Sequence, residues 1–166
     1  MVEGGEKKPV VANGKPKIWF DSIEAAMRDL AEGKFLLVVD NEDRENEGDL
    51  VIAAEKVTTE KMAFMKSARV KFSGLICVPA TSERLDQLKL PLMVPQNTEK
   101  MKTAYTISVD YRHSLQPVGV ICELVRDDGS MARRDDCRAF ADEHGLKLIT
   151  IEDIVKYRLE KGLLNI

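Results

Sequence analysis

Residues 35–54 read FLLVVDNEDRENEGDLVIAA, and the fold follows most directly from this stretch. Six of the ten residues 40–49 are acidic, and Arg44 is the one basic residue among them. The apolar runs on both sides, 35–39 and 50–54, contain β-branched residues and predict buried strands. A dense negative charge therefore separates two segments that belong in a core.

Outside this stretch, helical and strand patterns alternate. Helical spacing and capping residues predict helices over 20–34, 60–68, 82–88, 135–145 and from 150 onward. The fourth of these is expected to have Asp135 or Asp136 as its cap and to end at Gly145. Short apolar or alternating runs predict strands over 74–79, 104–110, 118–125 and 146–151. We therefore expect an α/β chain of the α+β type. We expect residues 19–166 to form a single domain, a mixed β-sheet flanked by helices, after a flexible tail over 1–18.

Composition narrows the classes of function. The chain has 166 residues, 44% of them hydrophobic, and a net charge of -3. This predicts one core and no general attraction to nucleic acid or to an anionic membrane. No apolar run is long enough to span a bilayer, and residues 1–17 lack the apolar core of a signal peptide. Three cysteines without a CxxC pair indicate free thiols in a reducing, cytoplasmic compartment.

Three of the acids stand at alternating positions, namely Glu45, Glu47 and Asp49. In an extended segment this spacing places all three carboxylates on one face, where like charges repel. Water, a divalent cation such as Mg²⁺, or a role in carrying protons would relieve the repulsion. A solvated acidic turn between two strands explains the same pattern without any chemistry, and spacing alone does not separate these interpretations.

A further acid, Glu123, stands alone within the apolar run VGVICELV. Burial would raise its pKa and suit it to general acid–base work. An ion pair or a solvent-facing position would explain it equally simply, but the apolar residues on both sides favour burial.

Several blocks of the chain resemble one enzyme family. The block DRENEGDLVIAAE is similar to a signature of 3,4-dihydroxy-2-butanone 4-phosphate synthases. The resemblance continues in the same order through TTEKMAFM, SGLICVP, ERLDQLKLPLMV, TAYTISVD, PVGVICELVRDDGSMAR and HGLKLITIEDIVKY. These collinear blocks cover most of residues 20–157 and imply a synthase-like fold.

The resemblance implies a lyase of riboflavin biosynthesis that uses Mg²⁺ or Mn²⁺. Such enzymes convert D-ribulose 5-phosphate, a small sugar phosphate, into formate and 3,4-dihydroxy-2-butanone 4-phosphate. A metal that chelates the sugar oxygens would stabilise the enediolate charge, and nearby carboxylates would carry protons. The resemblance also implies a homodimer with active sites at the subunit interface.

Carried over position by position, the resemblance assigns site residues. Glu45 becomes the metal ligand and contacts substrate, and Arg44 and Asp49 bind substrate. Glu47 and Glu123 become catalytic acids or bases. Cys77 would line the site as a catalytic residue and Thr106 as a substrate-binding residue. From the residues alone, Cys77 is more readily an inert core thiol, and Thr106 equally fits an ordinary strand threonine.

The chain departs from the family pattern near 114–117. Family members have a long additional stretch here, with two active-site histidines, one of them a metal ligand, and an arginine–threonine segment that holds the phosphate. In this chain Ser114 is followed directly by LQPVGV. Nothing replaces those residues position by position, because His113 and His144 match no catalytic histidine. Four arginines, Arg112, Arg126, Arg133 and Arg134, could attract phosphate, but such residues are more often solvated.

Two explanations remain open for this departure. The sequence joins two parts of a longer chain, or the protein is a genuinely shortened variant with half a metal site. The abrupt change within the expected site favours the first. The leading function is therefore the synthase, and the alternative is a catalytically degenerate binding or regulatory subunit of the same fold.

Overall fold

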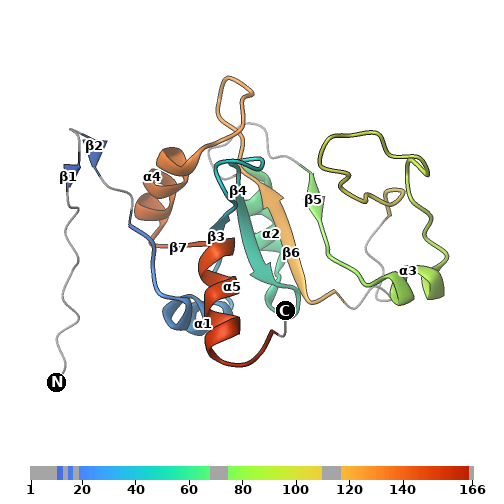
Figure 1. Cartoon of the computed structure of the whole chain (residues 1–166), viewed down its shortest axis with the longest axis horizontal. Coiled ribbons are helices and arrows are strands. Elements are labelled where there is room, and N and C mark those ends of the chain that lie inside the picture. Colours follow the sequence, from blue (N-terminus) through green and yellow to red (C-terminus); the bar gives the residue numbers. More distant parts are fainter. Residues whose placement is uncertain (1–10, 13–14, 17–18, 68–74, 110–116, 165–166) are drawn as a thin grey trace.

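A computed structural model describes residues 11–12, 15–16, 19–67, 75–109 and 117–164. Its main feature is a five-stranded mixed sheet in the order β5-β6-β4-β3-β7 (Figure 1). The strands are β3 Leu36–Val39, β4 Gly48–Ala53, β5 Ile76–Cys77, β6 Gly119–Glu123 and β7 Lys147–Thr150. Neighbouring strands pair antiparallel, except that β3 and β7 are parallel.

Two further short strands lie in the region expected to be a tail. β1 Val11–Ala12 pairs antiparallel with β2 Lys15–Pro16. The remaining residues of the expected tail, 1–10, 13–14 and 17–18, are outside the described residues. Its flexibility therefore stays a prediction.

The described helices are α1 Ile23–Ala31, α2 Thr59–Ser67, α3 Ser82–Leu88, α4 Arg134–His144 and α5 Ile151–Glu160, with a 3₁₀ turn at Ala54–Lys56. Side-chain caps fix several boundaries: Ser22 caps α1, Thr81 caps α3 and Thr150 caps α5. None of the helices described is both long and apolar enough to cross a bilayer.

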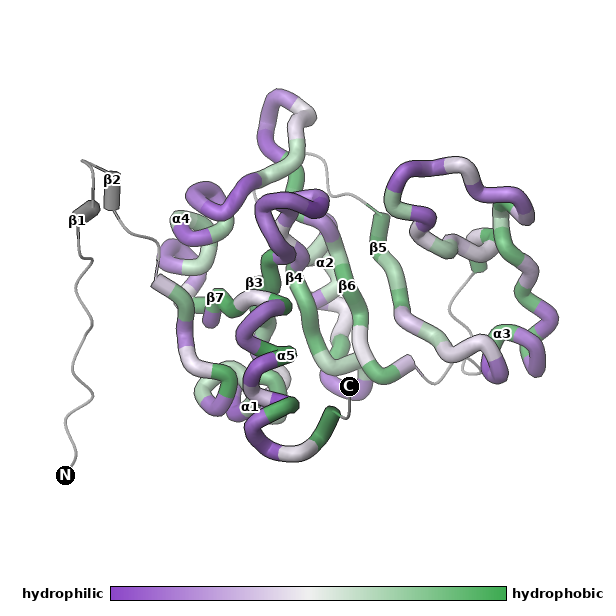
Figure 2. Tube along the Cα trace, viewed as in Figure 1, coloured by the Kyte–Doolittle hydropathy of each residue, from purple (hydrophilic) through white to green (hydrophobic). Residues whose placement is uncertain are grey.

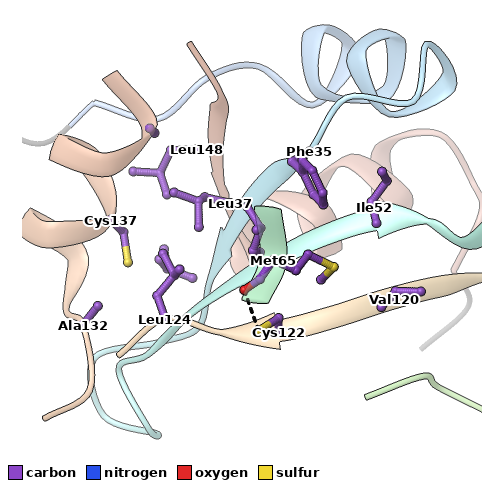
Figure 3. Close-up of a cluster of buried hydrophobic side chains, with 13 residues drawn as sticks. Phe35, Leu37, Ile52, Met65, Val120, Cys122, Leu124, Ala132, Cys137 and Leu148 are labelled. Atoms are coloured by element: carbon purple, nitrogen blue, oxygen red, sulfur yellow. Dashed lines mark hydrogen bonds between the residues drawn. The ribbon is translucent and has the colours of Figure 1, made fainter. Parts of the chain in front are cut away.

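The sheet is covered by helices on both faces because its strand residues alternate. On one face Leu37, Leu50 and Leu148 pack with residues of α2 and α4, including Met65 and Cys137 (Figure 3). On the other face Leu36 and Ile149 pack with α1 and α5. Register enforces this division, since Leu37 lies opposite both Leu50 and Leu148.

The quoted stretch forms the hairpin β3–β4, as its pattern predicts. Val39 pairs with Gly48, so residues 40–47 form the connecting loop. Figure 2 shows this hydrophilic loop between apolar strands. We call residues 40–47 the acidic loop.

Two predicted strands are wrong in extent. The run 74–79 was expected to be a buried strand, yet β5 has two residues and Leu75 is 61% exposed. The run 104–110 makes one isolated bridge, between Thr106 and Leu92, in the part that is described. Both runs lie beyond the helix-covered centre of the sheet, where no described layer buries their apolar side chains.

The predicted cap of α4 is also wrong, because Arg133 is the N-cap and Asp136 accepts the backbone N–H of Arg133. The predicted end is confirmed: Gly145 has a φ of 64° and ends the helix in the left-handed conformation that glycine tolerates.

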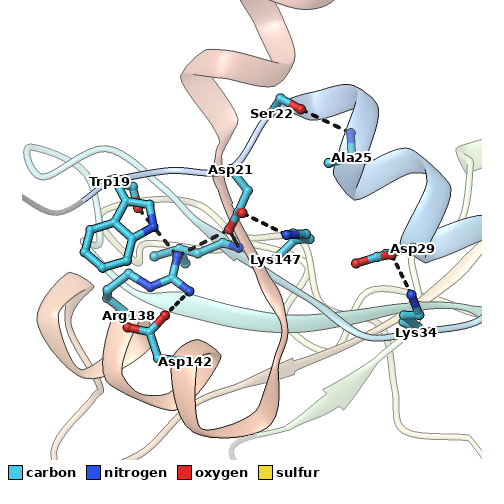
Figure 4. A network of polar contacts seen from close by, with 10 residues as sticks. Trp19, Asp21, Ser22, Ala25, Asp29, Lys34, Arg138, Asp142 and Lys147 are labelled. Atoms are coloured by element: carbon cyan, nitrogen blue, oxygen red, sulfur yellow. Dashed lines mark hydrogen bonds and ion pairs between the residues drawn. The ribbon is translucent and has the colours of Figure 1, made fainter. Parts of the chain in front are cut away.

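A polar network ties the start of the domain to its end (Figure 4). Asp21 accepts hydrogen bonds from the Lys147 ammonium at 3.1 Å and from the Leu148 backbone N–H at 2.9 Å. Arg138 of α4 contacts the Asp21 carboxylate at 3.3 Å and lies over the Trp19 ring. The segment before α1 is thereby fixed to β7 and α4.

Gly48 illustrates how closely β4 and α4 pack. A Cβ atom at this position would lie 2.2 Å from the Cys137 Sγ, which is impossible without movement. The glycine is needed for close approach, since its φ is not in the left-handed region.

We predict that Gly48→Ala lowers the free energy of unfolding by about 2–4 kcal/mol, because the new methyl group overpacks the core. In a Cys137→Ala background the clash disappears, and the same change should cost less than about 1 kcal/mol. Urea denaturation of wild type, Gly48→Ala, Cys137→Ala and the double variant gives the double-mutant cycle. Gly119→Ala is the control, since its Cβ would meet Ile52 at an ordinary 3.4 Å. Equal costs in both backgrounds would contradict the packing account.

Candidate functional site

The candidate site lies where the acidic loop meets strands β4 and β6. Asp49 of β4 lies directly opposite Glu123 of β6 in the antiparallel register. Cys77 of β5 pairs with Ile121, two residues before Glu123, and therefore lies on the same face of the sheet. This is the face opposite the α2 and α4 core, since Leu50 and Cys122 point the other way. The sheet thus brings together three predicted site residues from three strands.

The acidic loop does not have the extended shape that its spacing predicts. Residues 42–45 form a turn, and Asn46 has a φ of 54° in the left-handed region. Strict alternation of Glu45, Glu47 and Asp49 on one face of a strand is therefore wrong. The charges still converge, because the turn folds Glu45 back toward β4.

Asp40 organises the loop, although no spacing rule singled it out. Its carboxylate accepts the backbone N–H of Glu45 at 3.0 Å and that of Glu47 at 2.8 Å. Arg44 donates to the carboxylates of Asp40 at 3.0 Å and Glu45 at 2.7 Å. The signal available in the sequence was an acid at the end of a buried strand, a position typical of turn-capping side chains.

Two arginines hold the loop from α4. Arg133 donates to the backbone carbonyls of Glu45 and Asn46, and Arg134 donates to the Glu42 carboxylate and the Asp40 carbonyl. The third, Arg126, pairs with Asp136. The prediction that these arginines are solvated surface charges is therefore wrong for Arg133 and Arg134, which are partly buried against the loop. Attraction of a phosphate stays a prediction. Arg112 and His113 lie outside the described residues.

Carboxylate crowding governs the electrostatics of the site. Burial, followed by the charges of Glu123, Asp40, Glu47 and Glu45, raises the pKa of Asp49 from 3.8 to about 6. Burial and neighbouring carboxylates also raise the pKa of Glu47 and of Glu123. Burial, together with Glu123 and Asp49, raises the pKa of the Cys77 thiol, so Cys77 remains a neutral thiol at neutral pH. These raised pKa values suit acid–base work.

A pocket of about 360 Å³ opens beside Glu45. Its other walls come from the segment between α3 and β6. The lining residues are Leu92, Met93, Val94, Asn97, Glu99, Lys102, Thr103, Ala104 and Tyr105. The segment was expected to supply a strand, and Tyr105 was not predicted as a site residue. Burial and then the charges of Glu123, Cys77, Glu45 and Asp49 raise the pKa of Tyr105, as expected for a phenol facing the acids.

Thr106 is not among the residues that line this pocket. Its hydroxyl donates to the Ile107 carbonyl at 3.0 Å. Its predicted role in binding substrate therefore stays a prediction. His144 lies far along α4 and packs against Phe64 and Phe140, as a structural residue would.

The described residues include no group of three or more histidine, cysteine, aspartate or glutamate side chains placed to hold a metal ion. The donors that converge are carboxylates, which is the ligand type that Mg²⁺ prefers. Mg²⁺ commonly binds proteins through one or two carboxylates and keeps several waters. The carboxylate set therefore fits an open Mg²⁺ site rather than a closed cage.

Comparison with known proteins decides the family. The model of the 3,4-dihydroxy-2-butanone 4-phosphate synthase family matches residues 24–116 and 112–157. The chain belongs to the 3,4-dihydroxy-2-butanone 4-phosphate synthase family. A Schizosaccharomyces pombe protein of that name is 38% identical over 199 aligned residues, which cover 82% of this chain and 96% of the relative.

Family structures share the fold. A synthase described in complex with two magnesium ions is 32% identical, with a TM-score of 0.73 over 87% of this chain and 100% of that one. The two-domain synthase RibBX of A. baumannii gives a TM-score of 0.68, and this chain covers 58% of it. Against the Nocardia farcinica protein RibBA the chain is 38% identical and spans 48% of that relative's length.

The comparisons also locate the departure from the family. The two family matches meet at residues 112–116. The alignment to the Schizosaccharomyces pombe protein extends over 199 positions, although this chain has 166 residues. That relative therefore carries residues with no counterpart here, consistent with the family segment expected near 114–117.

The raised pKa of Asp49 has a consequence for stability. Between about pH 4 and pH 6 the folded protein keeps a proton that the unfolded chain has lost, so stability falls as pH rises through this window. We predict that Asp49→Asn raises the free energy of unfolding at pH 7.5 by about 1–3 kcal/mol without divalent metal. The gain should vanish below about pH 4.

Urea denaturation from pH 4 to pH 8 in the presence of chelator measures this effect. Asp86→Asn, on the exposed surface of α3, is the control and should change stability little at any pH. Equal stability of Asp49→Asn and wild type at pH 7.5 would show that burial and neighbouring charges do not disfavour the ionised Asp49 carboxylate in the folded protein.

Proposed function

We propose that this protein is a 3,4-dihydroxy-2-butanone 4-phosphate synthase of riboflavin biosynthesis, a lyase that releases formate from D-ribulose 5-phosphate. The observation that carries the proposal is the pairing of Asp49 with Glu123 beside the acidic loop. Carboxyl groups with raised pKa values are what repeated proton transfers on a sugar require, and Glu45 of the same loop lines a pocket. Family membership supplies the substrate.

Proton transfer is assigned to the carboxyl groups of the sheet. With a pKa of about 6, Asp49 exchanges a proton readily near neutral pH. Glu123 lies across the same strand pair, so the two carboxyl groups face one substrate from neighbouring strands. Glu47 follows the turn and adds a third group with a raised pKa. One group can therefore accept a proton while another donates one.

The cofactor proposed is Mg²⁺, or Mn²⁺, with Glu45 as its protein ligand. Support comes from the carboxylate set and from the family member described with two magnesium ions. When bound, the cation would stabilise negative charge on the substrate oxygens. Glu45 is suited to the role because its backbone is held by Asp40 and Arg133 while its side chain borders the pocket. The pocket volume fits a pentose phosphate.

We expect purified protein of known intact mass to release formate from D-ribulose 5-phosphate only with Mg²⁺ present.

We predict that Glu123→Gln lowers kcat by about 10²–10⁴-fold, because a side-chain amide neither accepts nor releases a proton near neutral pH. Glu152→Gln is the matched control, since Glu152 pairs with Lys156 on exposed α5. Wild-type protein of 18.6 kDa without turnover would contradict the proposed activity.

One observation favours a second candidate function. The family model matches in two parts that overlap at 112–116, and the alignment to the Schizosaccharomyces pombe relative is longer than this chain. A chain lacking the family's histidines and phosphate-binding arginine would keep the fold and half of the metal site. Such a protein would serve as a non-catalytic binding or regulatory subunit. Mg²⁺ binding without formate release, by a chain of the stated mass, would favour this alternative.

We also propose that the protein is a cytoplasmic homodimer. Large apolar side chains stay exposed around β5 and the pocket segment, and exposed apolar patches commonly mark interfaces. These are Leu75, Ile76, Leu92, Met93, Val94, Ile107 and Val118.

We predict that light scattering after size exclusion gives twice the mass of one chain. Leu75→Glu should shift the protein to monomer with its fold intact, whereas Leu163→Glu, at an exposed site after α5, should not. A wild-type monomer would contradict this arrangement.

A further inference from the structure

One side chain outside the acidic loop makes its closest contacts with that loop. Arg133 is the N-cap of α4, and its Nη1 donates to the Glu45 carbonyl at 2.6 Å and to the Asn46 carbonyl at 2.8 Å. Both acceptors are backbone atoms of the turn that carries the proposed metal ligand. The guanidinium is thus bound to the backbone of the loop and is partly buried.

The shape of the turn explains why an arginine is needed. Asn46 adopts a left-handed φ of 54°, and this brings the carbonyls of Glu45 and Asn46 to one donor. Neither carbonyl belongs to a strand ladder, so each needs a partner. A charged donor forms stronger hydrogen bonds to such carbonyls than a neutral one.

The loop is held from two sides. Asp40 accepts the N–H groups of Glu45 and Glu47, while Arg133 donates to the carbonyls of Glu45 and Asn46. The backbone at Glu45 is therefore bound on both its donor and its acceptor side. Without Arg133 the loop would keep the contacts of Asp40, Arg44 and Arg134, but none of these side chains donates to the Glu45 or Asn46 carbonyl among the described contacts.

Arg133 is itself fixed to the strand that carries Glu123. The preceding residue, Ala132, donates its N–H to the Leu124 carbonyl at 2.9 Å. Leu124 in turn donates to the Gly48 carbonyl at 2.9 Å. The Arg133 backbone N–H donates to Asp136 at 2.8 Å. The guanidinium therefore links the Glu45 turn to the end of β6, where Glu123 lies.

We propose that Arg133 is a positioning residue of the site: it fixes the Glu45–Asn46 turn relative to Glu123, so that Glu45 is preorganised for a divalent cation and substrate. The inference rests on the proposed function for its effect on turnover. Its effect on the loop and on cation binding is measurable without turnover.

The test compares Arg133→Gln, Arg133→Lys and Arg126→Gln. The last variant is the matched control, because Arg126 also contacts Asp136 but makes no described contact with the acidic loop. Each is examined by Mg²⁺ titration in a calorimeter, by hydrogen exchange of the peptide covering 40–49, and by kcat and KM for formate release. Circular dichroism confirms that each variant folds.

We expect Arg133→Gln to weaken Mg²⁺ binding and lower kcat by at least threefold, and to speed exchange in 40–49, while Arg126→Gln stays within threefold of wild type. Arg133→Lys keeps the charge but not the planar donor group, so it should retain wild-type folding and still lose at least threefold in Mg²⁺ affinity. If Arg133→Gln does not fold, the Mg²⁺ affinity of Arg133→Lys alone tests the positioning role.

Three results would overturn the inference. Arg133 variants within threefold of wild type in Mg²⁺ affinity and kcat would exclude a positioning role. An equal loss in Arg126→Gln would show a general effect of charge. Wild-type Mg²⁺ affinity and kcat in Arg133→Lys would also show a general effect of charge. Failure of the proposed function is distinguishable, because wild type itself would then release no formate, while Mg²⁺ titration and hydrogen exchange of 40–49 would still test the positioning role. Absence of Mg²⁺ binding by wild type would overturn the inference as well, because the site that Arg133 positions would not exist.

Discussion

The main constraint on the structure is the crowding of carboxylates at the junction of the acidic loop with β4 and β6. Asp49 and Glu123 face each other across two strands, and Glu45 and Glu47 follow from the loop. Burial and such crowding both disfavour the ionised carboxylates, and together they raise the pKa of Asp49. The surrounding structure compensates by binding the loop backbone through Asp40 and through α4. A well-packed core can support a strained site of this kind.

Helix α4 joins the core to the site. Its inner side places Cys137 against Gly48, which allows the helix to approach β4 closely. Its first turn places Arg133 and Arg134 against the acidic loop. Farther along, Arg138 binds Asp21 and fixes the start of the domain. One helix therefore sets the distance between the hydrophobic core and the carboxylates, so packing and site geometry are coupled.

Family membership and the internal departure from the family bear on different parts of the molecule. The sheet, the helices and the carboxylates agree with a synthase, as the TM-score of 0.73 and the two family matches indicate. The two family matches overlap at 112–116, between the pocket segment and β6. The acidic loop, Asp49 and Glu123 all lie outside this overlap. The two candidate functions differ in whether the protein has the histidines and the phosphate-binding arginine expected of the family.

The sequence by itself determined the hairpin 35–54, the interleaved helices and strands, and the family, because periodicity and short motifs are local signals. It also named Glu45, Asp49 and Glu123 as candidate site residues. Only the tertiary structure decided the pairing of Asp49 with Glu123, the left-handed turn at Asn46, and the partners of Arg133 and Arg134. Those contacts join residues as far apart as the acidic loop and α4. Local patterns carry no information about which distant backbone carbonyl an arginine will meet.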